Sequence, residues 1–181
     1  MMRRVLLALL LALPLSAFAA DYRMDAAQSQ LGFAGTVQGE SFEGRFAAFS
    51  ADIRFDPESL SESRFDVRID LASADSQNEE RDSTLKGEEF FAVERLPQAN
   101  YRAEHFRRLD DGRFVADGEL TLRGITRPVS LRFRWIPGNP ARLQGEAEIK
   151  RLDFAVGGGD WADEDAIANA VRVVTSLTLN P

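Results

Sequence analysis

The sequence predicts an all-β protein: an antiparallel barrel of about eight strands, with one or two short helices as a plug. Three observations predict this fold. Apolar and polar residues alternate with period two through most of the chain. Turn signals separate the alternating segments at short spacing. No internal repeat or linker divides the chain, so residues 20–181 are predicted to form a single domain.

Each alternating segment has one apolar and one polar face, which indicates antiparallel pairing. The predicted strands, in chain order, are 31–37, 51–55, 65–71, 101–109, 114–122, 129–135, 143–149 and 173–179. Turns such as Asp110-Asp111-Gly112 join neighbours as hairpins, which favours a meander. Between Phe42 and Phe55 the apolar residues change from even to odd positions, which predicts a bulge or sharp bend.

Two segments depart from the alternation. Residues 73–95, here called the plug segment, are polar and then aromatic, and predict one or two helical turns that end before Pro97. Ser76 is the predicted N-cap, with Glu79 completing a capping box. Residues 157–165, here called the Trp161 loop, begin with three glycines and are predicted to form a flexible loop.

Residues 1–19 have the pattern of a secretory signal peptide. Arg3 and Arg4 precede an apolar run over 5–13, and Ala17 and Ala19 are the small residues that signal peptidase reads. We expect cleavage after Ala19, with cleavage after Ala20 or an uncleaved anchor as alternatives. The protein is therefore predicted to be exported to the periplasm.

Composition narrows the chemistry. The 181 residues include no cysteine and one histidine, and the formal net charge is −7. These counts exclude disulfides, thiol catalysis and sites with two imidazoles, and the acidic balance weighs against nucleic acid as a partner. His105 is predicted to face inward by its parity with Tyr101, but no serine–aspartate arrangement accompanies it. We expect no catalytic residues, no metal site and no cofactor.

Two ordered motifs carry a resemblance to a known family. The first is Glu80-Arg81-Asp82 followed by Leu85, Phe90-Phe91, Pro97 and Ala99; the second runs from Gly118-Glu119-Leu120 to Pro128-Val129. With them, the chain resembles the YceI-like family of exported lipocalin-like proteins. The resemblance implies a barrel with a long apolar pore that binds a polyisoprenoid chain, such as a polyprenyl phosphate or an isoprenoid quinone. The Trp161 loop resembles a branch associated with membrane b-type cytochromes, which implies a possible cytochrome partner.

Candidate site residues follow from parity and from this resemblance. The candidates for the pore lining are Phe33, Phe42, Phe46, Phe55, Phe90, Phe91, Tyr101, Leu120 and Leu122. The alternative is that these nine residues pack together in the core and line no pore. Arg81, Lys86 and Arg45 are candidates for the ligand headgroup. The alternative for Arg81 is structural: it pairs with Glu80, Asp82 or a carbonyl at a strand end and anchors the plug segment.

The leading hypothesis is an exported protein that sequesters or carries an isoprenoid lipid or quinone without reacting with it. The first alternative is an interaction module with a packed interior, which contacts a membrane redox protein through the Trp161 loop. The second is a hydrolase or isomerase that uses His105 with a carboxylate, although no nucleophile motif accompanies it.

Overall fold

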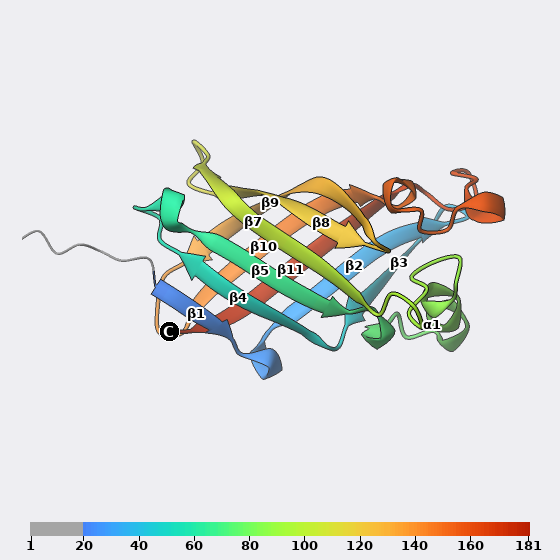
Figure 1. The fold of residues 1–181 in the computed structure, drawn as a ribbon, viewed down its shortest axis with the longest axis horizontal. Coiled ribbons are helices and arrows are strands. Elements are labelled where there is room, and N and C mark those ends of the chain that lie inside the picture. The colour runs from blue at the N-terminus through green and yellow to red at the C-terminus, as the bar shows by residue number, and fades with distance from the viewer. Residues whose placement is uncertain (1–19) are drawn as a thin grey trace, which may run out of the picture.

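The computed structural model describes residues 20–181, and the predicted signal peptide lies outside them. One antiparallel sheet closes on itself as a barrel (Figure 1). Around the barrel the strands are β1 (Ala20–Met24), β4 (Phe49–Phe55), β5 (Arg64–Asp70), β7 (Gln98–Arg108), β8 (Phe114–Leu122), β9 (Ile125–Ile136), β10 (Ala141–Lys150) and β11 (Ala170–Asn180). β11 pairs with β1 and closes the barrel.

The first two strands of the barrel are each made of two pieces. β1 continues as β2 (Gln30–Val37) after a short 3-10 turn at Ala26–Gln28, and β3 (Glu40–Phe46) continues as β4. Gln38 and Gly39, both at positive φ, form the tight turn between β2 and β3. β11 therefore pairs with β2 along most of its length and with β1 only at its end.

The bend predicted between Phe42 and Phe55 is confirmed by the break between β3 and β4. At this break the amide of Ala47 donates to the carbonyl of Ser73 (3.1 Å), and the amide of Ala48 donates to the Ser73 hydroxyl (3.0 Å). The short strand β6 (Ala74–Asp75) pairs with the end of β3. These hydrogen bonds and the pairing of β6 with β3 tie the plug segment to the barrel wall.

The plug segment contains one α-helix, α1 (Glu79–Lys86). The prediction of Ser76 as its N-cap was wrong, because the Asn78 side chain accepts from the amide of Arg81 and caps the helix. Asparagine caps as well as serine does, and Asn78 directly precedes the first turn. Ser76 is buried instead, and its amide and hydroxyl both donate to Asp82 Oδ1 (2.8 and 2.6 Å).

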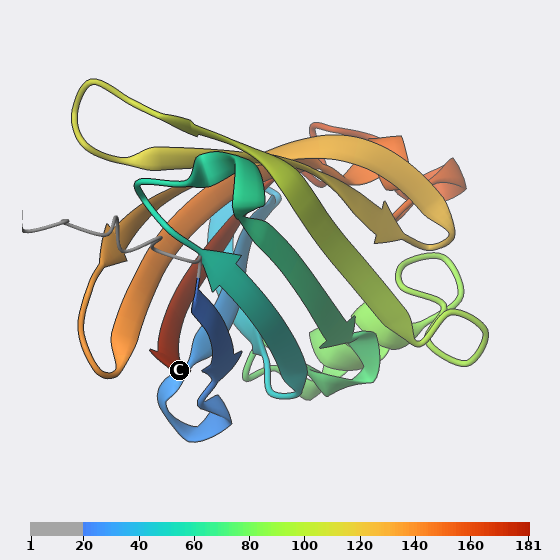
Figure 2. The same ribbon diagram turned by 60° about the vertical axis from the view of Figure 1, so that its left-hand side comes forward.

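The plug segment and the β10–β11 connection lie at the same end of the barrel, whereas β1 and the end of β11 lie at the opposite end (Figures 1 and 2). The β10–β11 connection carries two 3-10 turns, at Arg151–Phe154 and Gly159–Trp161. Two further 3-10 turns lie elsewhere: Leu60–Glu62 links β4 to β5, and Leu71–Ser73 follows β5. In the part of the chain that the structure describes, no helix has the length and apolar character to cross a bilayer.

Aromatic rings fill the half of the barrel near β1. This group, here called the aromatic block, contains Tyr22, Phe55, Phe65, Phe106, Phe114, Phe133 and Trp135. Phe55 lies at its centre, with ring centroids 5.0 to 6.1 Å from five of the other rings. Offset and edge-to-face contacts at such distances stabilise an aromatic cluster beyond its buried area.

One β-bulge explains an error in the predicted orientation of His105. The register of β7 against β8 shifts between Ala103 and His105, which inverts the alternation beyond the bulge. His105 is therefore exposed, and Phe106 packs against Phe55 and Phe65 in the aromatic block.

Candidate ligand-binding site

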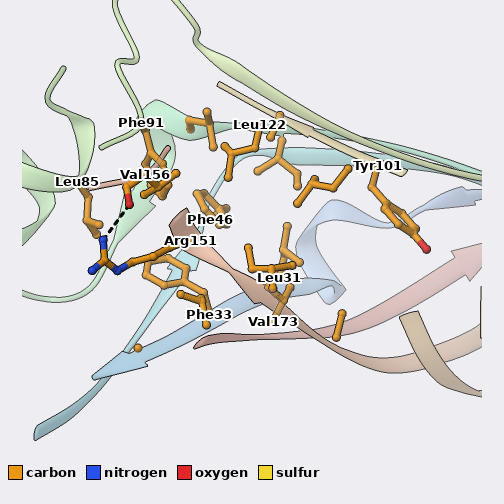
Figure 3. A pocket seen from close by; sticks show the side chains of 18 of the residues that line it. Leu31, Phe33, Phe46, Leu85, Phe91, Tyr101, Leu122, Arg151, Val156 and Val173 are labelled. Carbon is orange, nitrogen blue, oxygen red and sulfur yellow. Dashed lines mark hydrogen bonds between the residues drawn. The ribbon is translucent and has the colours of Figure 1, made fainter. Parts of the chain in front are cut away.

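The other half of the barrel encloses a cavity of about 480 Å³. Its wall is almost entirely apolar, and side chains from strands on all sides of the barrel point into it (Figure 3). Several inward residues, including Phe46, Val67 and Val173, are only half-buried although they face the interior. Their exposure is to the cavity, so the core is not packed shut.

Most of the predicted lining residues contribute to this wall. They are Phe33, Phe42, Phe46, Phe90, Phe91, Tyr101, Leu120 and Leu122. Phe55 does not line the cavity, because it lies at the end of β4 inside the aromatic block. Period-two alternation predicts which face a residue occupies but not its depth along the barrel, which is why Phe55 could not be separated from the others.

The β2–β3 hairpin forms part of the wall through two cross-strand pairs of phenylalanine and glycine. Phe33 lies opposite Gly44, and Phe42 lies opposite Gly35. A Cβ on Gly35 would lie 2.9 Å from the Phe42 ring, and a Cβ on Gly44 would overlap the Phe33 ring. The missing side chains therefore allow both rings to lie flat over the partner strand.

The cavity opens at the end of the barrel that carries the plug segment. Its exposed lining residues are Asn78, Glu80 and Thr84 from α1 and its N-cap, and Trp161 from the Trp161 loop. These residues define a mouth between the helix and the loop. A ligand that enters here meets polar groups first and apolar wall behind them.

Arg81 is the cation at this mouth. Its guanidinium lies over the Phe42 ring, 4.4 Å from the centroid, and its Nε donates to the Ser76 hydroxyl (2.9 Å). The predicted alternative of an ion pair with Glu80 or Asp82 is not formed, since no carboxylate among residues 20–181 lies within ion-pair distance of Arg81. Its terminal nitrogens remain available for an anionic group.

The structure places the other two headgroup candidates away from the cavity wall. Arg45 pairs with Asp75 on the outer face (3.0 Å), and Lys86 lines a shallow outer groove beside Asp82. Arg81 alone of the three predicted cations lines the cavity.

Arg151 is a cavity-lining residue that the sequence did not single out. It is buried, and its guanidinium donates to five main-chain carbonyls of the β10–β11 connection: Ala168 (3.2 Å), Val156 (3.0 Å), Gly157 (2.5 Å), Trp161 (2.9 Å) and Ile167 (2.8 Å). Burial lowers the pKa of the Arg151 guanidinium from its ordinary value. A lone arginine at the end of a predicted strand gives no sequence signal for such a role.

Contacts between the Trp161 loop and the plug segment close one side of the mouth. The Trp161 ring packs edge-on against Phe90 (5.6 Å between centroids), and its Nε1 donates to the Glu89 carboxylate. Arg123, in the β8–β9 turn, donates to the carbonyls of Glu89 (2.7 Å) and Phe90 (2.6 Å). The Trp161 loop is therefore tied to the plug segment, which Arg123 ties in turn to the β8–β9 turn, so the loop is not free as its glycines suggested.

Tyr101 brings a phenol hydroxyl to the cavity wall. Its hydroxyl points away from the mouth (Figure 3), donates to the carbonyl of Ala116 (2.9 Å) and lies 3.2 Å from that of Val129. Burial raises the pKa of this phenol well above its usual range. Because the barrel wall already satisfies the hydroxyl, the floor of the cavity behaves as an apolar surface.

No group of three or more histidines, cysteines or carboxylates suited to a metal ion occurs within residues 20–181. The arrangement instead offers apolar volume with one cation at the opening.

A family model agrees with this geometry. Residues 22–179 match the YceI-like domain. The chain belongs to the YceI-like family. A UPF0312 protein of Vibrio parahaemolyticus is 29% identical over 179 residues, which cover 92% of this chain and 95% of the relative. One from Photorhabdus laumondii is 32% identical over 149 residues, 77% of each chain.

Solved structures confirm the predicted lipocalin-like barrel for this YceI-like chain. BcnA of Burkholderia cenocepacia superposes with a TM-score of 0.82 at 26% identity, over 87% of this chain and 99% of BcnA. A polyisoprenoid binding domain from Saccharophagus degradans superposes with a TM-score of 0.67 at 18% identity, over 90% and 98% of the two chains. At that identity the second likeness shows the fold alone.

Proposed function

We propose that this protein binds a polyisoprenoid-type amphiphile, such as a polyprenyl phosphate or an isoprenoid quinone, and carries or sequesters it unchanged. The observation that supports this most directly is the open apolar cavity with one unpaired cation at its mouth. Each methylene buried there contributes about 0.8 kcal/mol, so a few isoprene units offset the cost of association. The Saccharophagus degradans domain, which has the same fold, is a polyisoprenoid binding domain and so supports this ligand class.

The headgroup of the proposed ligand lies at the mouth, because the tail occupies the apolar cavity. A tail that fills the cavity leaves its polar end between α1 and the Trp161 loop, where Arg81 has no carboxylate partner. The apolar floor gives a headgroup no partner, since the Tyr101 hydroxyl is already bonded to the wall. The tail therefore enters first.

Export to the periplasm is part of the proposal and rests on the signal pattern of residues 1–19. A protein that holds an apolar tail away from water suits a compartment between two membranes. Cell fractionation followed by N-terminal sequencing of the mature protein tests it, and a mature chain that begins at Ala20 is the expected result.

Mass spectrometry of organic extracts from the purified protein tests ligand binding. We expect a prenyl lipid in extracts of the wild type, or in wild type loaded with farnesyl diphosphate. Phe46→Asp, which places a carboxylate on the cavity wall, should abolish loading. Ser41→Asp introduces the same charge at an exposed position of β3 and should load normally. Equal loading of the two variants, or none by the wild type, would contradict the proposal.

The cytochrome partner stays a prediction, and one observation favours a docking role for the Trp161 loop. Trp161 is 41% exposed although its ring and its indole nitrogen both have partners within the protein. Capture of a membrane cytochrome by the wild type but not by Trp161→Ala would support this second function. The packed interior that accompanied it in the sequence hypothesis is wrong, because the barrel holds the cavity.

A further inference from the structure

The aromatic block divides the barrel interior into a filled half and an open half. Phe65 lies on the boundary, since it lines the cavity and also packs against Phe106 (4.8 Å between ring centroids) and Phe133 (5.3 Å). Phe55, Phe65 and Phe133 are each 1% exposed, so the rings leave no passage for a tail beyond this point. The cavity is therefore blind.

The cavity volume limits how much tail it holds. An engineered apolar cavity of about 150 Å³ in another protein holds one benzene molecule, which corresponds to about 25 Å³ for each carbon. At that ratio the 480 Å³ cavity encloses about 19 carbons, close to four isoprene units. Two acyl chains of about 16 carbons each would need about 800 Å³.

From the blind end and the volume together, we infer that this protein selects amphiphiles with a single apolar tail and encloses about four isoprene units, with Phe65 as the stop. The inference rests on the proposed function and defines its ligand class more narrowly. Longer tails enter only in part and leave their remaining units in solvent at the mouth. A lipid with two acyl chains of about 16 carbons each would leave about 13 of its tail carbons outside the cavity, so it is disfavoured relative to a single tail that fits.

A series of prenyl diphosphates tests the length limit. Calorimetric titration with geranyl, farnesyl, geranylgeranyl and solanesyl diphosphate covers two, three, four and nine units. Each added unit should tighten binding by at least about tenfold up to four units. Five carbons at about fourfold for each buried methylene set an upper limit of about a thousandfold for each unit. Solanesyl diphosphate should bind no tighter than geranylgeranyl diphosphate.

Two opposite substitutions test the position of the stop. Phe65→Ala removes a ring from the floor, so solanesyl diphosphate should bind about tenfold tighter than it does to the wild type. Ala51→Phe adds a ring to the cavity wall, so the tightest ligand should change from four units to three. Ala170→Phe adds the same ring at an exposed position of β11 and should leave the length dependence unchanged. If Phe65→Ala does not fold, Ala51→Phe and the wild-type series still test the length limit.

The possible results separate this inference from the proposed function. Affinity that keeps rising from four to nine units in the wild type, or an unchanged optimum in folded Ala51→Phe, would overturn the length limit while ligand binding stands. Tight binding of a two-chain phospholipid from mixed micelles would overturn the single-tail limit. Lack of binding at every length would overturn the proposed function itself.

Discussion

At the scale of single residues, Arg81 differs from the arginines that form ion pairs on the surface, because its guanidinium has no carboxylate partner. Arg45, Arg54, Arg95 and Arg113 each pair with a carboxylate on the surface. Arg81 instead lies over an aromatic ring and bonds a serine hydroxyl beside the cavity. A cation in this position recognises negative charge at the end of a tail that is already buried.

Substitution of Arg81 should therefore affect charged ligands more than neutral ones. Arg81→Gln should weaken binding of farnesyl diphosphate by about tenfold, because a charge-assisted hydrogen bond is lost, and should change binding of farnesol by much less. Competitive displacement of a fluorescent fatty acid measures both ligands. Arg45→Gln removes a cation that lies outside the cavity, and an equal loss in that variant would argue against a specific role for Arg81.

At the scale of elements, the β10–β11 connection is ordered mainly by hydrogen bonds from one buried side chain, Arg151, and not by strand pairing. The connection has no strand pairing of its own apart from a single bridge between Val37 and Ile167. The five carbonyl bonds of Arg151 hold it against the barrel and shape one side of the mouth. Buried carbonyls without a partner are costly, so this arginine is expected to be essential for the order of the loop.

Arg151→Met tests this structural role. The variant keeps much of the side-chain volume but leaves the carbonyls unsatisfied, and we expect a loss of about 2–4 kcal/mol in the free energy of unfolding. Urea denaturation measures the loss. Arg172→Met removes an exposed arginine that pairs with Glu146 (3.0 Å) and should cost about 1 kcal/mol or less. Similar losses in the two variants would mean that Arg151 contributes no more than a surface ion pair.

The elements also show what the sequence could predict. β8 is found at its predicted bounds, and the other alternating segments are found within a few residues of theirs, because period two is imposed by the pleat itself. β1, β3 and β6 were not predicted as strands. β1 and β6 have five and two residues, too few for alternation to be recognised, and β3 lies where the change of parity predicted only a bulge or bend. The pairing of β1 and β6 depends on partners that are distant in the chain.

The site was predicted less completely than the fold, for a physical reason. Alternation places Phe33 and Phe55 on the same interior face, yet Phe33 lines the cavity and Phe55 lies in the aromatic block. Depth depends on how the strands tilt and pair around the barrel, which is a property of the whole sheet. The role of Arg151 depends likewise on the path of a loop that has no periodic signal.

At the scale of the whole molecule, ion pairs on the outer face connect neighbouring strands. Asp21 accepts from Arg54 between β1 and β4 (2.7 Å), and Asp117 accepts from Arg107 between β8 and β7 (2.9 Å). The bonds from Arg54 and from Arg107 are the main reason that the pKa values of these two carboxyls lie below their usual range, and the Ser130 hydroxyl adds to the effect at Asp117.

These lowered pKa values predict loss of stability in acid. Because the folded pKa lies below the unfolded value, the unfolded chain binds more protons as the pH falls, so the contribution is present above about pH 4 and is lost below it. Thermal unfolding followed from about pH 6 to pH 3 should show a falling midpoint. Asp117→Asn should show a smaller fall than the wild type. Asp153→Asn, an exposed carboxylate outside the ion pairs, should behave like the wild type, and a fall of equal size in all three proteins would contradict the assignment.

The arrangement of the two ends of the barrel has a practical consequence. Ala20 pairs with Phe55 and Asn180 pairs with Arg23, so the described chain starts and finishes beside the aromatic block, far from the mouth (Figure 1). A linker to a sensor chip, a bead or a reporter domain can therefore be attached at either terminus without obstructing ligand entry. A protein immobilised in this way presents its opening to the solution, which suits it to direct capture of amphiphiles from a flowing sample.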